Sequence, residues 1–126
     1  MENNILVIDD DKVIRDSFVL TFEDSAVKVT TAKDGIEGLN LFRKNHYNIV
    51  FLDLKMPGMS GVEVLEKMNQ VKKDALIYII TAFHQEFFDE LIRIREKGCK
   101  FQILQKPLNS GQLKEAVVQI LEKNNA

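Results

Sequence analysis

Short, continuous runs of apolar residues constrain the fold of this 126-residue chain more than any other feature. A run that is apolar at successive positions, rather than at every second one, is typical of a β-strand that is covered on both faces. Five segments have strand character, three of them strong and the last two weaker: residues 5–8, 48–52, 76–80, 27–31 and 101–104. We therefore expect a sheet that is buried on both sides.

Longer stretches, in which apolar residues recur with helical spacing, follow each of these runs. They cover residues 13–21, 36–42, 62–68, 87–94 and 113–121. Asp11, Asp34 and Asn109–Ser110 stand where three of the helices would begin and are expected to cap them. Strands that alternate with helices form parallel sheets, because the crossovers are right-handed. The sequence predicts an α/β fold, a three-layer αβα sandwich with a five-stranded parallel sheet.

Composition and charge exclude several classes of protein. The chain has 17 Lys and Arg against 19 Asp and Glu, a formal net charge of −2, which argues against a strongly basic nucleic-acid binder. Its one cysteine, Cys99, permits no intrachain disulfide and fits a reducing compartment. No apolar run approaches the roughly 18 residues of a membrane helix. We expect one cytoplasmic domain over residues 1–126, with a core at about 4–122, that binds neither nucleic acid nor membrane.

Polar groups suited to phosphate or metal chemistry follow the strand runs. Asp9–Asp10, Asp53 and Thr81 come directly after the three strong runs, and Lys106 comes shortly after the fifth. Ligands of open parallel α/β sheets bind beyond the carboxyl ends of the strands, so we expect these side chains to converge on one rim. Three crowded carboxylates repel one another unless a cation neutralises them. Oxygen ligands without a nearby Cys or His favour Mg²⁺.

A cluster of this kind can promote the transfer of a phosphoryl group from a donor to one of its own carboxylates. A carboxylate oxygen can accept a phosphoryl group and form an acyl phosphate. The metal would neutralise phosphoryl oxygens during in-line transfer, and the ammonium of Lys106 would hold another oxygen. The hydroxyl of Thr81 could then donate to the arriving group. The sequence thus contains every group that the phosphorylation of an aspartate requires.

Four segments resemble the receiver domain of a two-component response regulator: residues 5–11 (ILVIDDD), 50–61 (VFLDLKMPGMSG), 79–82 (IITA) and 106–107 (KP). The resemblance covers about residues 4–122. It implies a flavodoxin-like fold with strand order 2-1-3-4-5, and a signalling switch rather than an enzyme. A histidine kinase or phosphotransfer protein would donate the phosphoryl group in a Mg²⁺-dependent reaction, and the altered surface would be recognised by a downstream protein.

The resemblance also implies a role for each matching residue. Asp53 corresponds to the phosphoacceptor, Thr81 to the hydroxyl that reorients on phosphorylation, and Lys106 to the phosphate-binding lysine, whose bond to Pro107 is expected to be cis. The implied Mg²⁺ ligands are Asp10, Asp53 and the backbone carbonyl of Lys55, with Asp9 acting indirectly.

Two features depart from the family pattern. Ile103 stands three residues before Lys106, where the family has an aromatic residue that moves with the threonine, and the sequence leaves open whether Phe101 or another residue replaces it. The stretch from Thr81 to Lys106 is also longer than usual. An extra helical turn, or a longer loop near Gly98, would absorb the added residues.

Alternative functions stay open beside the switch. A Mg²⁺-dependent aspartyl-phosphate phosphatase needs a second acid two positions after Asp53, where this chain has Lys55. Phe83, two positions after Thr81, offers no acid or amide to position a water, so we expect the phosphorylated state to outlast seconds. A pseudo-receiver would bind partners without phosphorylation. The sequence names no kinase or target, and it fits a stand-alone phosphorelay intermediate, a diffusible switch or an excised receiver of any oligomeric state.

Other conspicuous residues have structural interpretations. His46 and His84 are expected to be exposed, and Cys99 to be a packed small residue rather than a redox centre. Phe87 and Phe88 are adjacent helical residues that diverge by about 100°, which leaves two alternatives open: one of them faces solvent as a candidate partner contact, or a longer inserted turn buries both.

Overall fold

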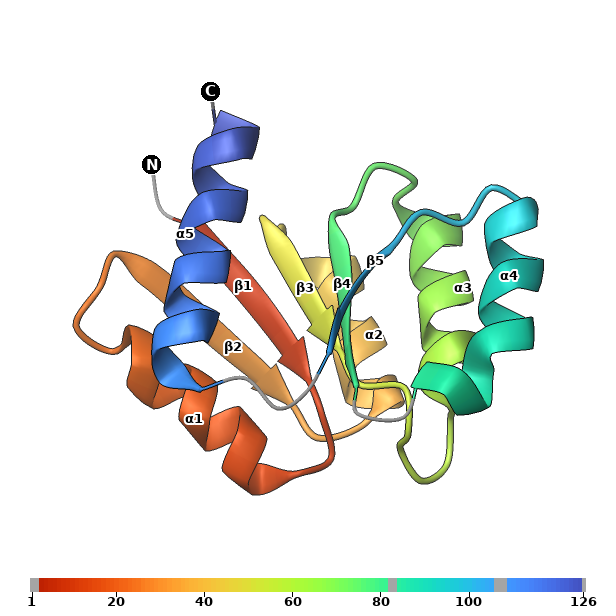
Figure 1. The fold of residues 1–126 in the computed structure, drawn as a ribbon, viewed down its shortest axis with the longest axis horizontal. Coiled ribbons are helices and arrows are strands. Elements are labelled where there is room, and N and C mark those ends of the chain that lie inside the picture. Colours follow the sequence, from red (N-terminus) through yellow and green to blue (C-terminus); the bar gives the residue numbers. More distant parts are fainter. Residues whose placement is uncertain (1–2, 82–83, 106–108, 126) are drawn as a thin grey trace.

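The computed structural model describes residues 3–81, 84–105 and 109–125 and contains a parallel sheet between two layers of helices (Figure 1). The strands are β1 (Asn3–Ile8), β2 (Val27–Ala32), β3 (Ile49–Leu52), β4 (Ile77–Thr81) and β5 (Gln102–Gln105). Every neighbouring pair is parallel, and the order is β2-β1-β3-β4-β5. The predicted three-layer architecture and the strand order 2-1-3-4-5 are confirmed.

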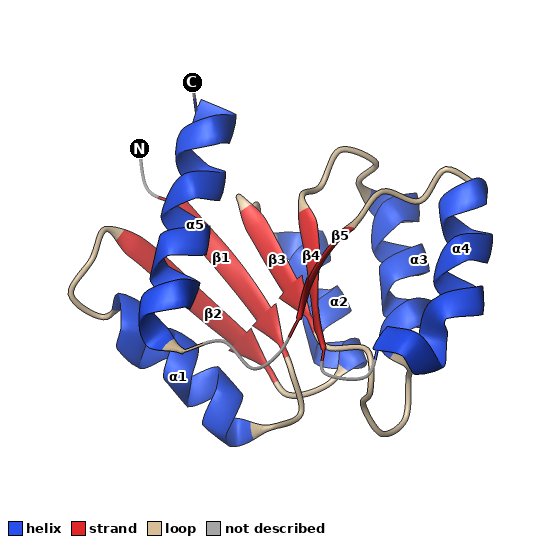
Figure 2. Cartoon of the chain, viewed as in Figure 1, coloured by secondary structure: helices blue, strands red, loops and turns tan. Residues whose placement is uncertain are grey.

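Helices cover both faces of the sheet (Figure 2). They are α1 (Lys12–Phe22), α2 (Gly35–Lys44), α3 (Gly61–Val71), α4 (Phe88–Glu96), α5 (Ser110–Asn125) and a single 3-10 turn, η1 (His84–Phe87). Helices α1 and α5 lie on one face, and α2, α3 and α4 lie on the other (Figure 1). Within the described ranges, no helix has both the length and the apolar character that crossing a bilayer requires.

The predicted helix caps are confirmed by hydrogen bonds. The carboxylates of Asp11 and Asp34 each accept a backbone N–H of the following first turn, at 2.9 and 2.8 Å. Asn109 and Gln112 cap α5 reciprocally: the Gln112 N–H donates to Asn109 Oδ1 at 2.8 Å, and the Asn109 N–H donates to Gln112 Oε1 at 3.0 Å. These bonds satisfy donors that a helix N-terminus leaves unpaired, and so fix where each helix begins.

The continuous apolar runs are buried on both faces, as their pattern predicts. Every residue of Ile5–Ile8 and Ile49–Leu52 is at most 1% exposed. Leu6 and Ile8 pack with the helices of the α2–α3–α4 face, whereas Ile5 and Val7 pack with α1 and α5. Because successive side chains of a strand point to opposite faces, one run builds both cores at once.

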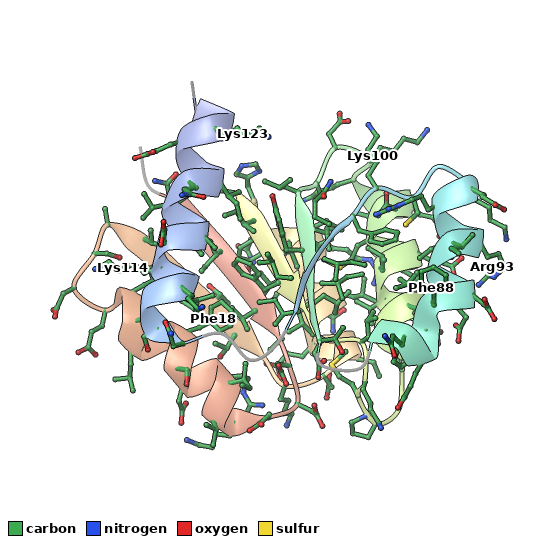
Figure 3. The ribbon with its side chains drawn as sticks, in the orientation of Figure 1. Phe18, Phe88, Arg93, Lys100, Lys114 and Lys123 are labelled. Carbon is green, nitrogen blue, oxygen red and sulfur yellow. The ribbon has the colours of Figure 1, made fainter. Side chains whose placement is uncertain are left out.

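The buried face of α1 differs from the predicted stripe over residues 13–21. The prediction is wrong for Val13 and Leu20, which are 69% and 65% exposed, and α1 instead buries Phe18 and Phe22. A helix turns about 100° per residue, so Leu20 lies about 200° around the helix from Phe18. The ring of Phe18 is placed between α1 and the sheet (Figure 3), with its centroid 5.1 Å from that of Phe51.

The structure confirms three of the expectations about single residues. Phe88 is 57% exposed on α4 (Figure 3), whereas Phe87 packs against the core. Cys99 is half-buried against the same cluster, and His46 is exposed. Burial raises the pKa of the Cys99 thiol, and the nearby carboxylate of Glu66 raises it further, although Arg95 opposes the change. A raised thiol pKa suits a packed residue rather than a reactive one. The side chain of His84 lies outside the described residues.

Phe101 is a core residue, 5% exposed, with the Arg95 guanidinium 4.1 Å from its ring centroid. The β4–β5 register places Gln105 beside Thr81, so Phe101 lies four residues, or about 13 Å, along the strand from that position. Ile103 is 38% exposed. Phe101 therefore lies too far along the strand to place its ring beside Thr81, and Ile103 has no aromatic ring to offer.

Candidate functional site

The carboxyl ends of the strands meet at one edge of the sheet (Figure 2), and the acidic residues follow them there. Parallel pairing continues one residue beyond the strands. The Asp53 N–H donates to the Ile8 carbonyl at 2.9 Å, and the Asp9 N–H donates to the Ala32 carbonyl at 3.1 Å. Because the backbone at both aspartates is held by the sheet, Asp9 and Asp53 are placed side by side.

Three carboxylates form a cluster at this edge, as the sequence predicts. One carboxylate oxygen from each of Asp9, Asp10 and Asp53 lies within 4.8 Å of the others. Asp9 and Asp53 are 3% and 8% exposed, whereas Asp10 is open to solvent. Asp9 Oδ1 accepts the Asp11 N–H at 2.9 Å, which orients its carboxylate. A cluster of oxygen donors with one solvent-facing member fits a hard divalent cation that keeps part of its water shell.

Thr81 lies on the strand beside Asp53. The β3–β4 register pairs Leu52 with Ile79, so Thr81 reaches the same edge of the sheet as Asp53. Its side chain is 1% exposed, and it is the last residue of β4, although the sequence places it just after the strand. The predicted lysine, Lys106, and the expected cis bond to Pro107 lie outside the described residues, as does Phe83. Gln105, the residue before Lys106, pairs with Thr81.

The loop after Asp53 also reaches the turn that precedes α4. Lys55 Nζ lies 3.5 Å from Glu86 Oε1 in η1, and both side chains are more than half exposed. An exposed pair of this kind contributes only about 0–1 kcal/mol to stability. The residue two positions after Asp53 is thus a cationic lysine rather than an acid.

Gly61, the first residue of α3, determines how closely this helix approaches the site. Its N–H donates to the Leu54 carbonyl at 2.9 Å. A Cβ at this position would lie 2.4 Å from Leu54 Cα and 2.5 Å from the Asp53 carbonyl oxygen. Both obstructing atoms belong to the backbone of the acidic loop. The sequence alone identifies Gly61 as a loop glycine and does not reveal this contact.

We expect Gly61→Ala to lower the free energy of unfolding by about 1–3 kcal/mol, the usual cost of overpacking, because backbone atoms cannot rotate away from the new methyl group. Urea denaturation measures the effect. Gly111→Ala is the matched control, since its Cβ would meet only Asn109 Oδ1, at 3.4 Å. The control should match the wild type or gain up to about 1 kcal/mol from helix propensity. Equal stabilities of the Gly61 variant and the wild type would contradict the close approach.

Arg15 is a charged residue at the site that the sequence alone does not single out. Its Nη1 donates to the backbone carbonyl of Asp9 at 2.9 Å, and the side chain is half-buried. The available signal is its spacing: Arg15 lies one turn after the cap Asp11, to whose carbonyl its own N–H donates at 3.1 Å. Helical side chains lean toward the N-terminus, so a long residue at this position can reach back to the end of β1.

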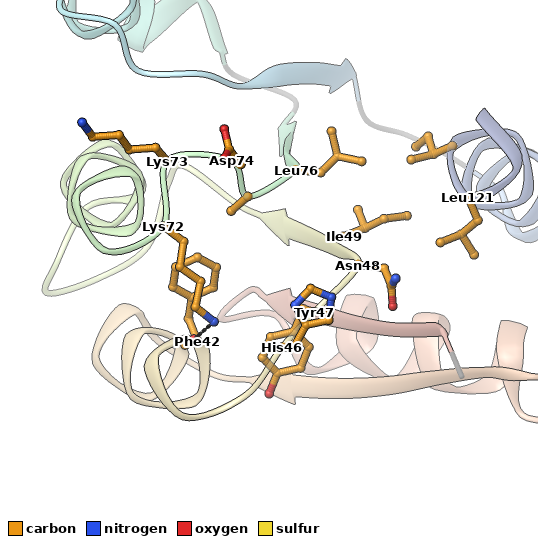
Figure 4. Close-up of a pocket in the computed structure, with 12 residues that line it drawn as sticks. Phe42, His46, Tyr47, Asn48, Ile49, Lys72, Lys73, Asp74, Leu76 and Leu121 are labelled. Carbon is orange, nitrogen blue, oxygen red and sulfur yellow. Dashed lines mark hydrogen bonds between the residues drawn. The ribbon is translucent and has the colours of Figure 1, made fainter. Parts of the chain in front are cut away.

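A separate hollow of about 410 Å³ lies at the opposite end of the sheet, between the α2–β3 loop, the α3–β4 loop and α5 (Figure 4). His46 and Leu121 are among its lining residues. The Lys72 ammonium donates to the carbonyls of Phe42 and Asn45, at 2.9 and 2.7 Å. The Lys72 ammonium therefore binds backbone carbonyls at the C-terminal end of α2. The three carboxylates of the acidic cluster do not line this hollow, because the cluster lies at the other edge of the sheet.

Comparison with known proteins identifies the family. Residues 5–118 match the family model described as the response regulator receiver domain. The chain is 28% identical over 121 residues to sporulation initiation phosphotransferase F of Bacillus subtilis (strain 168), which covers 96% of this chain and 95% of that protein. It is 39% identical over 83 residues to response regulator RR06 of Streptococcus pneumoniae serotype 2, covering 66% of this chain but only 38% of that protein.

Solved structures agree along the full chain. The response regulator receiver domain protein (CheY-like) of Methanospirillum hungatei JF-1 superposes with a TM-score of 0.86 at 26% identity, covering 99% of this chain and 98% of that one. A receiver domain protein of Clostridium thermocellum gives a TM-score of 0.78 at 27% identity, covering 98% and 97%. The chain therefore belongs to the response regulator receiver domain family, and it is a phosphorylation-controlled signalling switch.

Proposed function

We propose that Asp53 is the phosphoacceptor of this switch and that Asp9, Asp10 and Asp53 form its Mg²⁺ site, together with the backbone carbonyl of Lys55. The observation that carries the proposal is the carboxylate cluster, whose oxygens lie within 4.8 Å of one another beyond the sheet. Of the two buried members, Asp9 and Asp53, the more central is Asp53, because it follows β3, which lies between β1 and β4 in the sheet. Residue 53 therefore lies between the acidic pair that follows β1 and Thr81 at the end of β4.

Each residue would contribute a distinct part of the phosphoryl transfer. An oxygen of the Asp53 carboxylate forms the new P–O bond while the bond between phosphorus and the donor nitrogen breaks, and the donor imidazole leaves. Bound Mg²⁺ would neutralise charge on the phosphoryl oxygens. Asp10, which faces solvent, would hold the ion directly, and Asp9 would hold it indirectly. The Thr81 hydroxyl would donate to one phosphoryl oxygen, and Lys106 would bind another.

Response regulator receiver domains interact with histidine kinases or phosphotransfer proteins and with downstream effectors. For this chain we propose a donor of either kind and a downstream protein that recognises the phosphorylated surface. We also propose that residues 1–126 form one domain and that it is located in the cytoplasm. This domain would bind neither nucleic acid nor membrane.

Incubation with acetyl phosphate and Mg²⁺, followed by intact-mass measurement, tests the proposal. We expect one phosphoryl group per chain, retained for longer than seconds after the donor is removed, because Lys55 supplies no acid for hydrolysis. Continuous release of many equivalents of phosphate would instead indicate an aspartyl-phosphate phosphatase. Absence of labelling, with no binding of beryllofluoride, would indicate a pseudo-receiver. Either of these two outcomes would overturn the proposal.

Neutralising one carboxylate should stabilise the metal-free protein. We expect Asp10→Asn to raise the free energy of unfolding in EDTA by about 1 kcal/mol, because it removes like-charge repulsion within the cluster. We also expect this variant to lose the stabilisation that millimolar Mg²⁺ gives the wild type, since a cation that binds only the folded state stabilises it by RT ln(1 + [Mg²⁺]/Kd). Urea unfolding with EDTA and with Mg²⁺ measures both effects.

Asp74→Asn is the matched control for this experiment. Asp74 is 99% exposed in the α3–β4 loop, at the opposite end of the sheet. This variant should keep the full response to Mg²⁺. A Mg²⁺ response of Asp10→Asn as large as that of the wild type would exclude Asp10 as a ligand.

A further inference from the structure

We infer that Arg15 is a positioning residue of the metal site, which holds the peptide between Asp9 and Asp10 so that both carboxylates face one cation. The inference rests on the proposed Mg²⁺ site and adds a residue to it. The contact on which the inference rests is the hydrogen bond from the Arg15 guanidinium to the Asp9 carbonyl.

Three of the interactions of Asp9 are hydrogen bonds that hold it from different directions. Its N–H donates to the Ala32 carbonyl at 3.1 Å, which ties it to β2. Its Oδ1 accepts the Asp11 N–H at 2.9 Å, which sets the carboxylate. Its carbonyl accepts Arg15 Nη1 at 2.9 Å. Of these three bonds, only the last acts on the peptide that leads from Asp9 to Asp10, and only the last is made by a side chain of another residue.

Asp10 depends on that peptide more than Asp9 does. Its side chain is exposed, and across the described part of the chain no hydrogen bond or ion pair joins it to another residue. Its carboxylate still lies within the 4.8 Å cluster. The orientation of the preceding peptide is therefore what aims Asp10 at the cluster, and Arg15 holds that orientation.

Charge and geometry predict opposite effects of removing the guanidinium. Arginine is always protonated, so its removal takes a positive charge away from a cation site and by itself would tighten Mg²⁺ binding. Loss of a group that orients a metal ligand typically weakens metal binding by about 10–100-fold. The charge effect is small here, because Arg15 is half exposed and the high dielectric constant of the surrounding water weakens the repulsion between its charge and the cation. We expect the geometric effect to dominate.

Titration calorimetry of the unphosphorylated protein with Mg²⁺ tests the inference without using activity. We expect Arg15→Gln to raise the Kd for Mg²⁺ by about tenfold. Lys12→Gln is the control: it removes the same charge from the same helix, but Lys12 is 76% exposed and pairs with Asp16 at 2.6 Å. The control should bind Mg²⁺ as tightly as the wild type, or slightly more tightly.

A second variant separates positioning from charge and from folding. Arg15→Lys keeps the charge but lacks the planar fork of donors, so it should also bind Mg²⁺ more weakly than the wild type. Wild-type affinity in both Arg15 variants, or tighter binding, would overturn the inference, as would a shift of the unfolding midpoint with no change in Kd. If the wild type itself bound no Mg²⁺, the proposed metal site would fail instead, so the two failures are distinguishable.

Discussion

Asp53→Asn is expected to eliminate phosphorylation of the protein by acetyl phosphate. The amide oxygen has the size of the carboxylate oxygen but is a far weaker nucleophile, so no acyl phosphate can form at this position. Asp53 is 8% exposed and its backbone N–H is bound to the Ile8 carbonyl, so the side-chain change leaves the backbone contacts in place. Intact-mass measurement after incubation with donor and Mg²⁺ should show only the unmodified chain.

Asp74→Asn makes the same chemical change far from the cluster and should be labelled as fully as the wild type. Circular dichroism of both variants verifies that the fold is kept. A phosphoryl group that is still attached to Asp53→Asn with wild-type stoichiometry would place the acceptor at another residue and would contradict the proposed role of Asp53.

Phe51→Ala is expected to cause the largest loss of stability, about 3–5 kcal/mol. Phe51 is 1% exposed in β3, and its ring centroid lies 5.1 Å from that of Phe18 and 6.0 Å from that of Tyr78. Truncation removes the group that joins α1 to the sheet two residues before Asp53, and it leaves a cavity that both aromatic neighbours line. Urea denaturation, analysed as a two-state transition, measures the change.

Phe88→Ala is the matched control, because it deletes the same atoms from a side chain that is 57% exposed on α4. Its expected cost is within about 0.5 kcal/mol, as for most surface substitutions. Similar costs for the two variants would show that burial in β3 does not govern the stability of this fold.

The fold could be predicted because its main determinant is local. Ile5–Ile8 and Ile49–Leu52 are apolar at every position, and only a strand covered on both faces buries such a run completely. The acidic site was predictable for the same reason, since Asp9 and Asp53 mark the points where these runs end. Knowing where two parallel strands end is enough to place the residues that follow them on one edge.

The features that could not be predicted depend on how separate elements meet. The buried side of α1 is set by contact with Phe51, so spacing along the helix did not separate Phe18 from Leu20. Gly61 matters because the start of α3 touches the backbone of residues 53 and 54, which are neighbours only in three dimensions. Arg15 reaches Asp9 through the turn between β1 and α1, and its sequence position alone gives no direction to its side chain.

The position of the divalent cation tests the central claim most directly. Mn²⁺ can replace Mg²⁺ at oxygen sites, and its paramagnetism broadens the amide signals of nearby residues in an NMR spectrum. Substoichiometric Mn²⁺ should broaden the signals of residues 9–11 and 53–55 first, while residues 45–47 and 72–74 at the opposite end of the sheet stay sharp. Broadening centred on that opposite end, or spread evenly over the chain, would contradict a cation site built from Asp9, Asp10 and Asp53.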